Sequence, residues 1–188
     1  MVHALIIAFI GLLCAGVARA DLDLTPKLSE YNSEGFKVRK LVFLESGRDV
    51  TYIPPRDWDY SGSAAKLVLH PRQKAQAEAS ITKSVLGTAT RFDETTTKLL
   101  VAKALRSIPA GSTDVSLISQ EINPFPIAGK ETFRVSCTYT FYGENYTRSL
   151  LFVNRAADQI RFQLVCRTAD FEGLQKEFHR SLFSWQNL

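Results

Sequence analysis

The chain has 188 residues, of which 45% are hydrophobic and 22% are charged, and its formal net charge is +4. This length favours one domain, and this apolar fraction can form a core that needs neither a metal nor a disulfide to fold. Basic and acidic residues are mixed along the sequence, so it lacks the basic stripe that marks a nucleic-acid-binding protein.

Residues 1–20 are predicted to be a signal peptide. The apolar run from Ala4 to Val17 precedes Ala18-Arg19-Ala20, whose small residues suit the pocket of a signal peptidase. The run is shorter than the roughly 20 residues that a membrane-spanning helix needs, which argues against an uncleaved anchor. We therefore expect cleavage before Asp21 and an exported protein, periplasmic or extracellular, with no membrane span after cleavage.

The first part of the mature chain is predicted to consist of an arm and two strands. Residues 21–35 are polar and are expected to form an extended N-terminal arm. Residues 36–44 begin with alternation of apolar and polar residues and end with an apolar run, which predicts a strand, and residues 50–53 predict a second strand after a turn. Pro54-Pro55 ends the second strand, because proline cannot donate to a ladder.

A loop at residues 56–62 is predicted to lead into strands at 66–70 and 77–86. Asp93 follows as a helix N-cap, because its carboxylate can accept from the free backbone N–H groups of the first turn. The helix that it begins runs to about Ser107, with apolar residues at helical spacing.

The second part of the chain contains the clearest strand pattern. After a strand at 115–122, alternating residues predict strands at 132–142, 146–154 and 159–168, the first two joined by a three-residue loop at 143–145. Asp170 then begins a last helix, whose apolar stripe packs its length on the sheet. This order of elements predicts an α+β fold, an antiparallel sheet of about seven to eight strands with helices packed on it, in a single domain over residues 36–188.

Two cysteines, Cys137 and Cys166, remain after cleavage, and export by itself favours a disulfide between them. The predicted register argues against one: with Cys137 opposite Leu151 and Cys166 opposite Thr147, the two lie roughly 16 Å apart. A disulfide needs α-carbons within about 7 Å of each other. We therefore expect no disulfide and two buried free thiols.

Residue types that carry catalysis are not grouped in recognisable motifs. His70 and His179 belong to no spaced set of metal ligands, and both cysteines fall on apolar strand faces, where a thiol stays protonated. The sequence contains neither a nucleophile elbow nor a phosphate-binding loop. It therefore predicts no catalytic residue, no metal and no cofactor.

The loop at Arg56, Asp57, Trp58, Asp59 and Tyr60 is the candidate binding site. Loops carry function more often than cores do, and a carboxylate pair beside an aromatic ring could hold a sugar or a cation. The alternative is structural: Trp58 turns into the core and the two aspartates hydrogen-bond loop amides.

The chain resembles the PsbP-like superfamily, which is shared with the Mog-type Ran-binding factors and many bacterial exported proteins. The resemblance is carried by Tyr52-Ile53-Pro54-Pro55-Arg56-Asp57-Trp58, the alternating strand from Phe133 to Phe141, and the helix end from Phe178 to Phe183. It implies a PsbP-like α/β/α sandwich and a fold used mainly to bind other proteins rather than to catalyse.

Three functions remain open at this point. The favoured one is a non-enzymatic exported domain that binds another protein or an envelope assembly. The alternative is a small-ligand carrier or sensor, with a pocket between the sheet and the helices. An enzyme would need a polar cluster assembled from distant residues, such as Asp57, Asp59 and His70.

Overall fold

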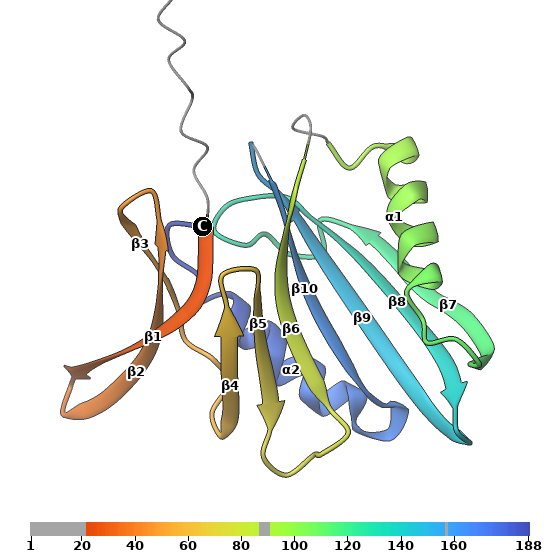
Figure 1. Ribbon diagram of the computed structural model, residues 1–188, viewed down its shortest axis with the longest axis horizontal. Helices are drawn as coiled ribbons and strands as arrows, with labels where there is room; N and C mark the ends of the chain where they lie inside the picture. Colours follow the sequence, from red (N-terminus) through yellow and green to blue (C-terminus); the bar gives the residue numbers. More distant parts are fainter. Residues whose placement is uncertain (1–21, 87–90, 157) are drawn as a thin grey trace, which may run out of the picture.

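The computed structural model describes residues 22–86, 91–156 and 158–188, so the expected signal peptide and cleavage site lie outside the described residues. The described chain forms two antiparallel sheets and two α-helices (Figure 1). The small sheet has the order β1-β2-β3 and consists of β1 (Leu22–Ser33), β2 (Phe36–Glu45) and β3 (Arg48–Tyr52).

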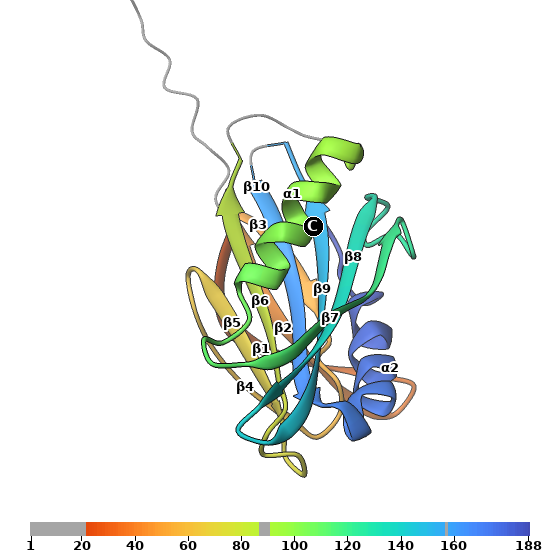
Figure 2. The same ribbon diagram turned by 90° about the vertical axis from the view of Figure 1, so that its right-hand side faces the viewer.

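The large sheet has the order β4-β5-β6-β10-β9-β8-β7. Its strands are β4 (Trp58–Ser63), β5 (Lys66–Pro71), β6 (Glu78–Val85), β7 (Thr113–Ile122), β8 (Thr132–Phe141), β9 (Glu144–Asn154) and β10 (Asp158–Arg167). Helix α1 (Glu94–Arg106) and helix α2 (Phe171–Leu182, after a 3-10 turn at Thr168–Asp170) lie on opposite faces of this sheet (Figure 2). The predicted α+β fold is therefore confirmed, with the strands divided between two sheets.

Two segments differ from the sequence-based expectation. The expected arm is strand β1, because Leu22 and Leu24 are fully buried and Ser33 pairs with Phe36 across a two-residue turn. The expected loop at residues 56–62 is strand β4 from Trp58 onward. Its composition is polar because β4 is the terminal strand of the large sheet and most of its side chains face solvent.

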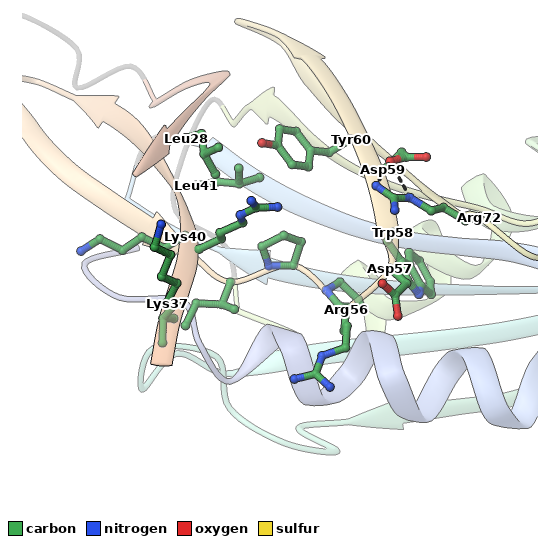
Figure 3. A pocket seen from close by; sticks show the side chains of 15 residues that line it. Leu28, Lys37, Lys40, Leu41, Arg56, Asp57, Trp58, Asp59, Tyr60 and Arg72 are labelled. Atoms are coloured by element: carbon green, nitrogen blue, oxygen red, sulfur yellow. Dashed lines mark hydrogen bonds and ion pairs between the residues drawn. The ribbon is translucent and has the colours of Figure 1, made fainter. Parts of the chain in front are cut away.

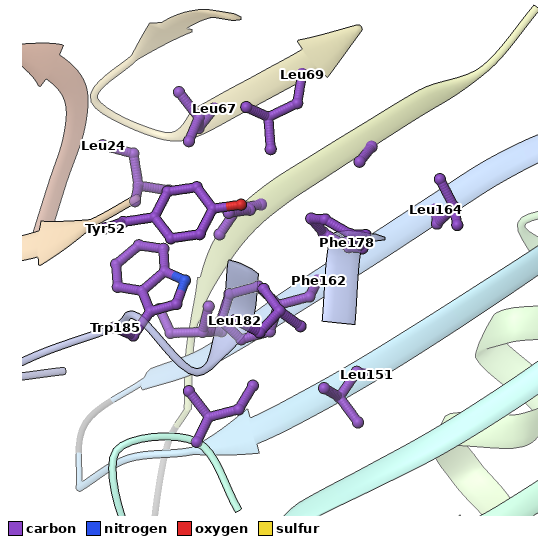
Figure 4. Close-up of a cluster of buried hydrophobic side chains, with 14 of the residues drawn as sticks. Leu24, Tyr52, Leu67, Leu69, Leu151, Phe162, Leu164, Phe178, Leu182 and Trp185 are labelled. Carbon is purple, nitrogen blue, oxygen red and sulfur yellow. The ribbon is translucent and has the colours of Figure 1, made fainter. Parts of the chain in front are cut away.

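The core consists of two hydrophobic clusters, one on each face of the large sheet. The larger cluster lies between this sheet, the small sheet and α2, and Figure 4 shows Tyr52, Trp185, Phe162 and Phe178 packed within it. The smaller cluster holds α1 against the β8–β9 end of the sheet. The predicted N-cap of α1 is present, since the Asp93 carboxylate accepts from the Thr96 N–H at 2.7 Å.

The strand register places the two cysteines on opposite faces of the large sheet. Cys166 lies opposite Thr147, as predicted, but Cys137 lies opposite Arg148 rather than Leu151. The difference arises because β8 and β9 are joined by two residues, Tyr142 and Gly143, both with positive φ, instead of a three-residue loop. Both thiols are buried and free.

No helix within the described part of the chain is long and apolar enough to span a membrane.

Candidate functional site: a groove between the two sheets

A groove of about 930 Å³ separates the small sheet from the first strand of the large sheet (Figure 3). One wall comes from the β1–β2 pair, and the other comes from the segment that links β3 to β4. The groove is lined by Leu28, Lys37, Val38, Arg39, Lys40, Leu41, Ile53, Pro54, Pro55, Arg56, Asp57, Trp58, Asp59, Tyr60 and Arg72. The five consecutive candidate binding residues, 56–60, all line this groove.

The groove exists because the chain leaves the small sheet at Ile53. The Ile53 N–H donates to the Ser184 hydroxyl oxygen at 2.8 Å, beyond the C-terminal end of α2. Pro54 and Pro55 have no N–H to donate, so β3 cannot continue along β2. The chain then enters the large sheet through Asp57, whose φ of 62° lies in the left-handed region. This local geometry separates the two sheets and leaves the space between them.

Trp58 forms part of the groove wall, but its indole is buried. Only 6% of Trp58 is exposed, and its ring stacks on Phe178 of α2 with centroids 6.1 Å apart. Its Nε1–H donates to Glu177 at 3.2 Å. Trp58 thus attaches β4 to α2 and makes this part of the groove wall rigid. Its ring face is not open to solvent and is not free to stack on a ligand.

Asp59 is occupied by a neighbouring arginine. The Arg72 Nε and Nη2 donate to Asp59 Oδ1 at 3.0 and 2.9 Å, and the Arg72 backbone N–H donates to the Asp57 carbonyl at 3.2 Å. The hydrogen bond to Asp59 raises the pKa of Arg72. Figure 3 shows this pair beside Trp58. The Asp59 carboxylate is therefore paired with Arg72 at the exposed side of β4.

The facing wall is basic. Lys37 and Arg39 of β2 are exposed and Lys40 of β2 is half-buried, and Arg56 adds a fourth cation, also exposed, from the opposite side. Arg39 donates to Glu30 at 2.8 Å, while Lys40 lies 5.4 Å from the centre of the Tyr31 ring. The groove therefore carries an excess of positive charge.

Apolar side chains lie among these cations. Leu28 is 51% exposed and Ile53 is 37% exposed, and both line the groove. The groove lining therefore combines partly exposed apolar side chains with cations. The sequence pattern of residues 36–44 identified a strand but missed this wall, because only the folded chain brings Lys37 and Lys40 opposite Arg56.

The two histidines lie outside the residues that line this groove. The His70 Nδ1 is 3.4 Å from the Ala77 carbonyl oxygen, and the His179 ring packs on Phe125 with centroids 4.9 Å apart. Asp59 and His70 do face each other across β4 and β5, but Asp59 bonds to Arg72. Within the described residues, no three His, Cys, Asp or Glu side chains are placed to hold a metal ion.

No family model and no curated protein sequence matches the chain. Among solved structures, it is similar to cyanobacterial PsbP from Synechocystis sp. PCC 6803, with a TM-score of 0.55, 12% identity, and coverage of 92% of this chain and 96% of that chain. LpqN of Mycobacterium tuberculosis, described as involved in cell envelope biogenesis, has a TM-score of 0.48 at 12% identity, covering 71% of this chain and 79% of LpqN. A Pseudomonas aeruginosa protein of unknown function has a TM-score of 0.44 at 11% identity, covering 86% and 97% of the two chains. At these identities the likeness concerns the fold alone, and the chain has the PsbP-like fold.

Proposed function

We propose that this protein is an exported, non-catalytic domain that binds another protein through the groove between its two sheets. The observation that carries the proposal is the composition of the groove. Exposed apolar side chains from Leu28 and Ile53 lie beside the cations Lys37, Lys40 and Arg56 on a surface built mainly from strands. Protein interfaces combine apolar anchors with a polar rim in this way.

The chemistry of the groove supports binding rather than catalysis. General acid–base catalysis needs a free proton donor or acceptor near the reacting group. Asp59 bonds to Arg72, and the indole N–H of Trp58 donates to Glu177. Asp57 is exposed in the groove, but the other charged side chains that line it are mainly basic, and together with the strand backbone they are suited to hold a polypeptide.

The position of the groove favours a protein over a small ligand. A carrier of the kind considered from the sequence needs a pocket between the large sheet and the helices. In the region next to the groove, that interface is filled by Tyr52, Phe178 and Trp185, which belong to one buried cluster. The groove itself lies between strands at the molecular surface, where a chain segment can enter from the side.

Site-specific cross-linking in the source cell tests this function. A photo-reactive residue at Ile53, which is exposed and lines the groove, should cross-link to one dominant protein. The matched control is Leu99, 62% exposed on α1 at the far end of the large sheet, which should not capture that protein. The Lys37→Glu, Lys40→Glu double variant should weaken capture at Ile53. Equal products from both positions, or none from either, would count against the proposal.

The proposed export has its own test. N-terminal sequencing of the protein recovered from the cell envelope or the medium should give Asp21 as the first residue. Recovery from the cytosol with Met1 intact would refute this part.

A further inference from the structure

The hydrogen bonds of the small sheet show which way the backbone of β2 points. The Thr51 N–H and carbonyl both bond to Gln186 of the C-terminal tail, at 3.2 and 3.1 Å, so they point away from β2. Backbone groups alternate between the two edges of a strand. The backbone N–H and carbonyl of the neighbouring Tyr52 therefore point toward β2, where the register partner of Tyr52 is Leu41.

The same alternation extends along β2. Leu41 directs its N–H and carbonyl toward the β3 side, and Arg39 and Lys37 direct theirs toward that same edge. The pairing of β2 with β3 covers only Leu41 to Glu45, because β3 ends before the two prolines. Within the described residues, no strand pairs with the Lys37–Lys40 stretch on this edge, while β1 covers its other edge. Lys37 and Arg39 thus offer two N–H and two carbonyl groups in the manner of an edge strand.

This uncovered edge faces the groove. The lining of the groove includes the five consecutive residues from Lys37 to Leu41, whose side chains alternate between the two faces of the strand. A groove over one face of β2 would be lined by every second residue of the strand. A groove along the edge of β2 is lined by consecutive residues, as this one is. The opposite wall is likewise a consecutive run, from Ile53 to Tyr60.

The charges select the occupant. The groove is lined by five cations, Lys37, Arg39, Lys40, Arg56 and Arg72, and by two carboxylates, Asp57 and Asp59, so acidic side chains are favoured there. The edge strand at the other end of the large sheet, β7, also exposes apolar groups such as Ile118 and Ile122. It carries Asp114 and Glu121, however, and its register shifts twice against β8, which makes it a poor template for an acidic strand.

We infer that the groove receives an extended, acidic segment of the partner protein, which pairs with Lys37 and Arg39 as an additional strand of the small sheet. This inference rests on the proposed function and specifies the form of the ligand. Backbone hydrogen bonds to β2 hold the segment, Lys37, Lys40 and Arg56 select its acidic side chains, and Leu28 and Ile53 contact its apolar ones.

A labelled ten-residue peptide of alternating Glu and Val tests the inference by fluorescence polarisation on the full chain. It should bind at least ten times more tightly than a Lys-Val peptide of equal length, and its binding should weaken as salt is added. The Lys37→Glu, Lys40→Glu double variant should lose at least tenfold in affinity. Lys103→Glu, on α1 away from the groove, is the matched control and should bind as the unmodified protein does.

Amide hydrogen exchange then tests the strand pairing itself. The bound peptide should slow exchange at Lys37 and Arg39 at least tenfold and leave Val38 and Lys40, which face β1, unchanged. A peptide that is N-methylated at every glutamate and every valine should not bind, because it cannot donate to the edge.

The outcomes separate the inference from the proposed function. Acidic binding that needs Lys37 and Lys40 but does not protect Lys37 and Arg39 would overturn the strand pairing and leave protein binding intact. Protection in β7 instead of β2, or equal binding of the basic peptide, would overturn the inference. Failure of both peptides would also overturn it, whereas the Ile53 cross-link decides the proposed function independently.

Discussion

The indole of Trp185 stacks on the phenol ring of Tyr52, with ring centroids 4.8 Å apart and an interplanar angle of 19°. Trp185 also stacks on Phe43 of β2 at 5.4 Å and meets Phe162 of β10 edge-on at 5.8 Å. A single side chain after α2 therefore contacts both sheets and holds them together.

Replacing Trp185 with alanine should destabilise the protein strongly. Truncation of a large buried aromatic side chain costs about 3–5 kcal/mol, because the lost contacts leave a cavity. Urea unfolding followed by circular dichroism measures the loss. Leu99→Ala, at an exposed site on α1, should change the unfolding free energy by less than about 0.5 kcal/mol. Comparable losses in the two variants would argue against the role assigned to Trp185.

Arg155 is the centre of a buried ion-pair cluster. Its guanidinium binds Glu45 of β2 at 2.6 Å and Asp158 at 2.6 Å, and all three side chains are less than one-tenth exposed. Arg155→Met should cost about 3–5 kcal/mol, because it leaves two buried carboxylates without their partner. Arg39→Met removes an exposed arginine from Glu30 and should cost less than about 1 kcal/mol. Urea midpoints of the two variants provide the comparison, and a small loss for Arg155→Met would contradict it.

The stability of the protein should fall in mild acid because of His179. Burial, with a further contribution from Arg134, lowers the pKa of His179 to about 4, so the folded state holds the ring neutral. The unfolded chain binds the proton more readily than the folded chain does. The free energy of unfolding is therefore unaffected by His179 above about pH 6.5, and it decreases as the pH falls from there toward 4.

Urea midpoints measured between pH 7 and pH 4 test this prediction. His179→Gln should flatten the decline, whereas His70→Gln, at an exposed position, should leave it unchanged. A decline of equal slope in all three proteins would show that other groups cause it.

The two cysteines should be unreactive until the protein unfolds. Burial raises the pKa of the Cys166 thiol to about 12 and also raises that of Cys137. Iodoacetamide at pH 8 should therefore leave the folded protein unmodified and should add two groups in guanidinium without reductant. Mass spectrometry reads the result. An unfolded protein that takes up no label would mean that the thiols had formed a disulfide.

Local signals in the sequence were sufficient for several elements. The Asp93 cap and the alternation in β8 to β10 depend on neighbouring residues, and the structure has them where the pattern predicts. The turn at Tyr142-Gly143 was predicted incorrectly, since tyrosine rarely adopts the positive φ of 49° that it has there. The wrong turn moved the partner of Cys137 by three residues, from Leu151 to Arg148, and an odd shift reverses the face on which Cys137 lies relative to Cys166.

The division into two sheets could not be predicted locally. The prolines at 54 and 55 predict where β3 ends, but the bond that fixes Ile53 beside α2 comes from Ser184, which is 131 residues away in sequence. Only one wall of the candidate site was predicted, because the other wall comes from a segment that is distant in sequence. Residues 56–60 are one local segment, but Lys37 and Lys40 meet them only across the groove.

The position of Trp185 affects the order in which the contacts of the core can form during synthesis. Phe43 and Tyr52 are synthesised well before Trp185, whose ring covers them, and the Tyr52 hydroxyl meets Ser181 across 129 residues of chain. Contacts of such long sequence separation form late, because the loop that they close has a large entropic cost. A nascent chain that does not yet include Trp185 would leave the rings of Phe43 and Tyr52 without their cover, and it would be a natural target for a chaperone until Trp185 is added.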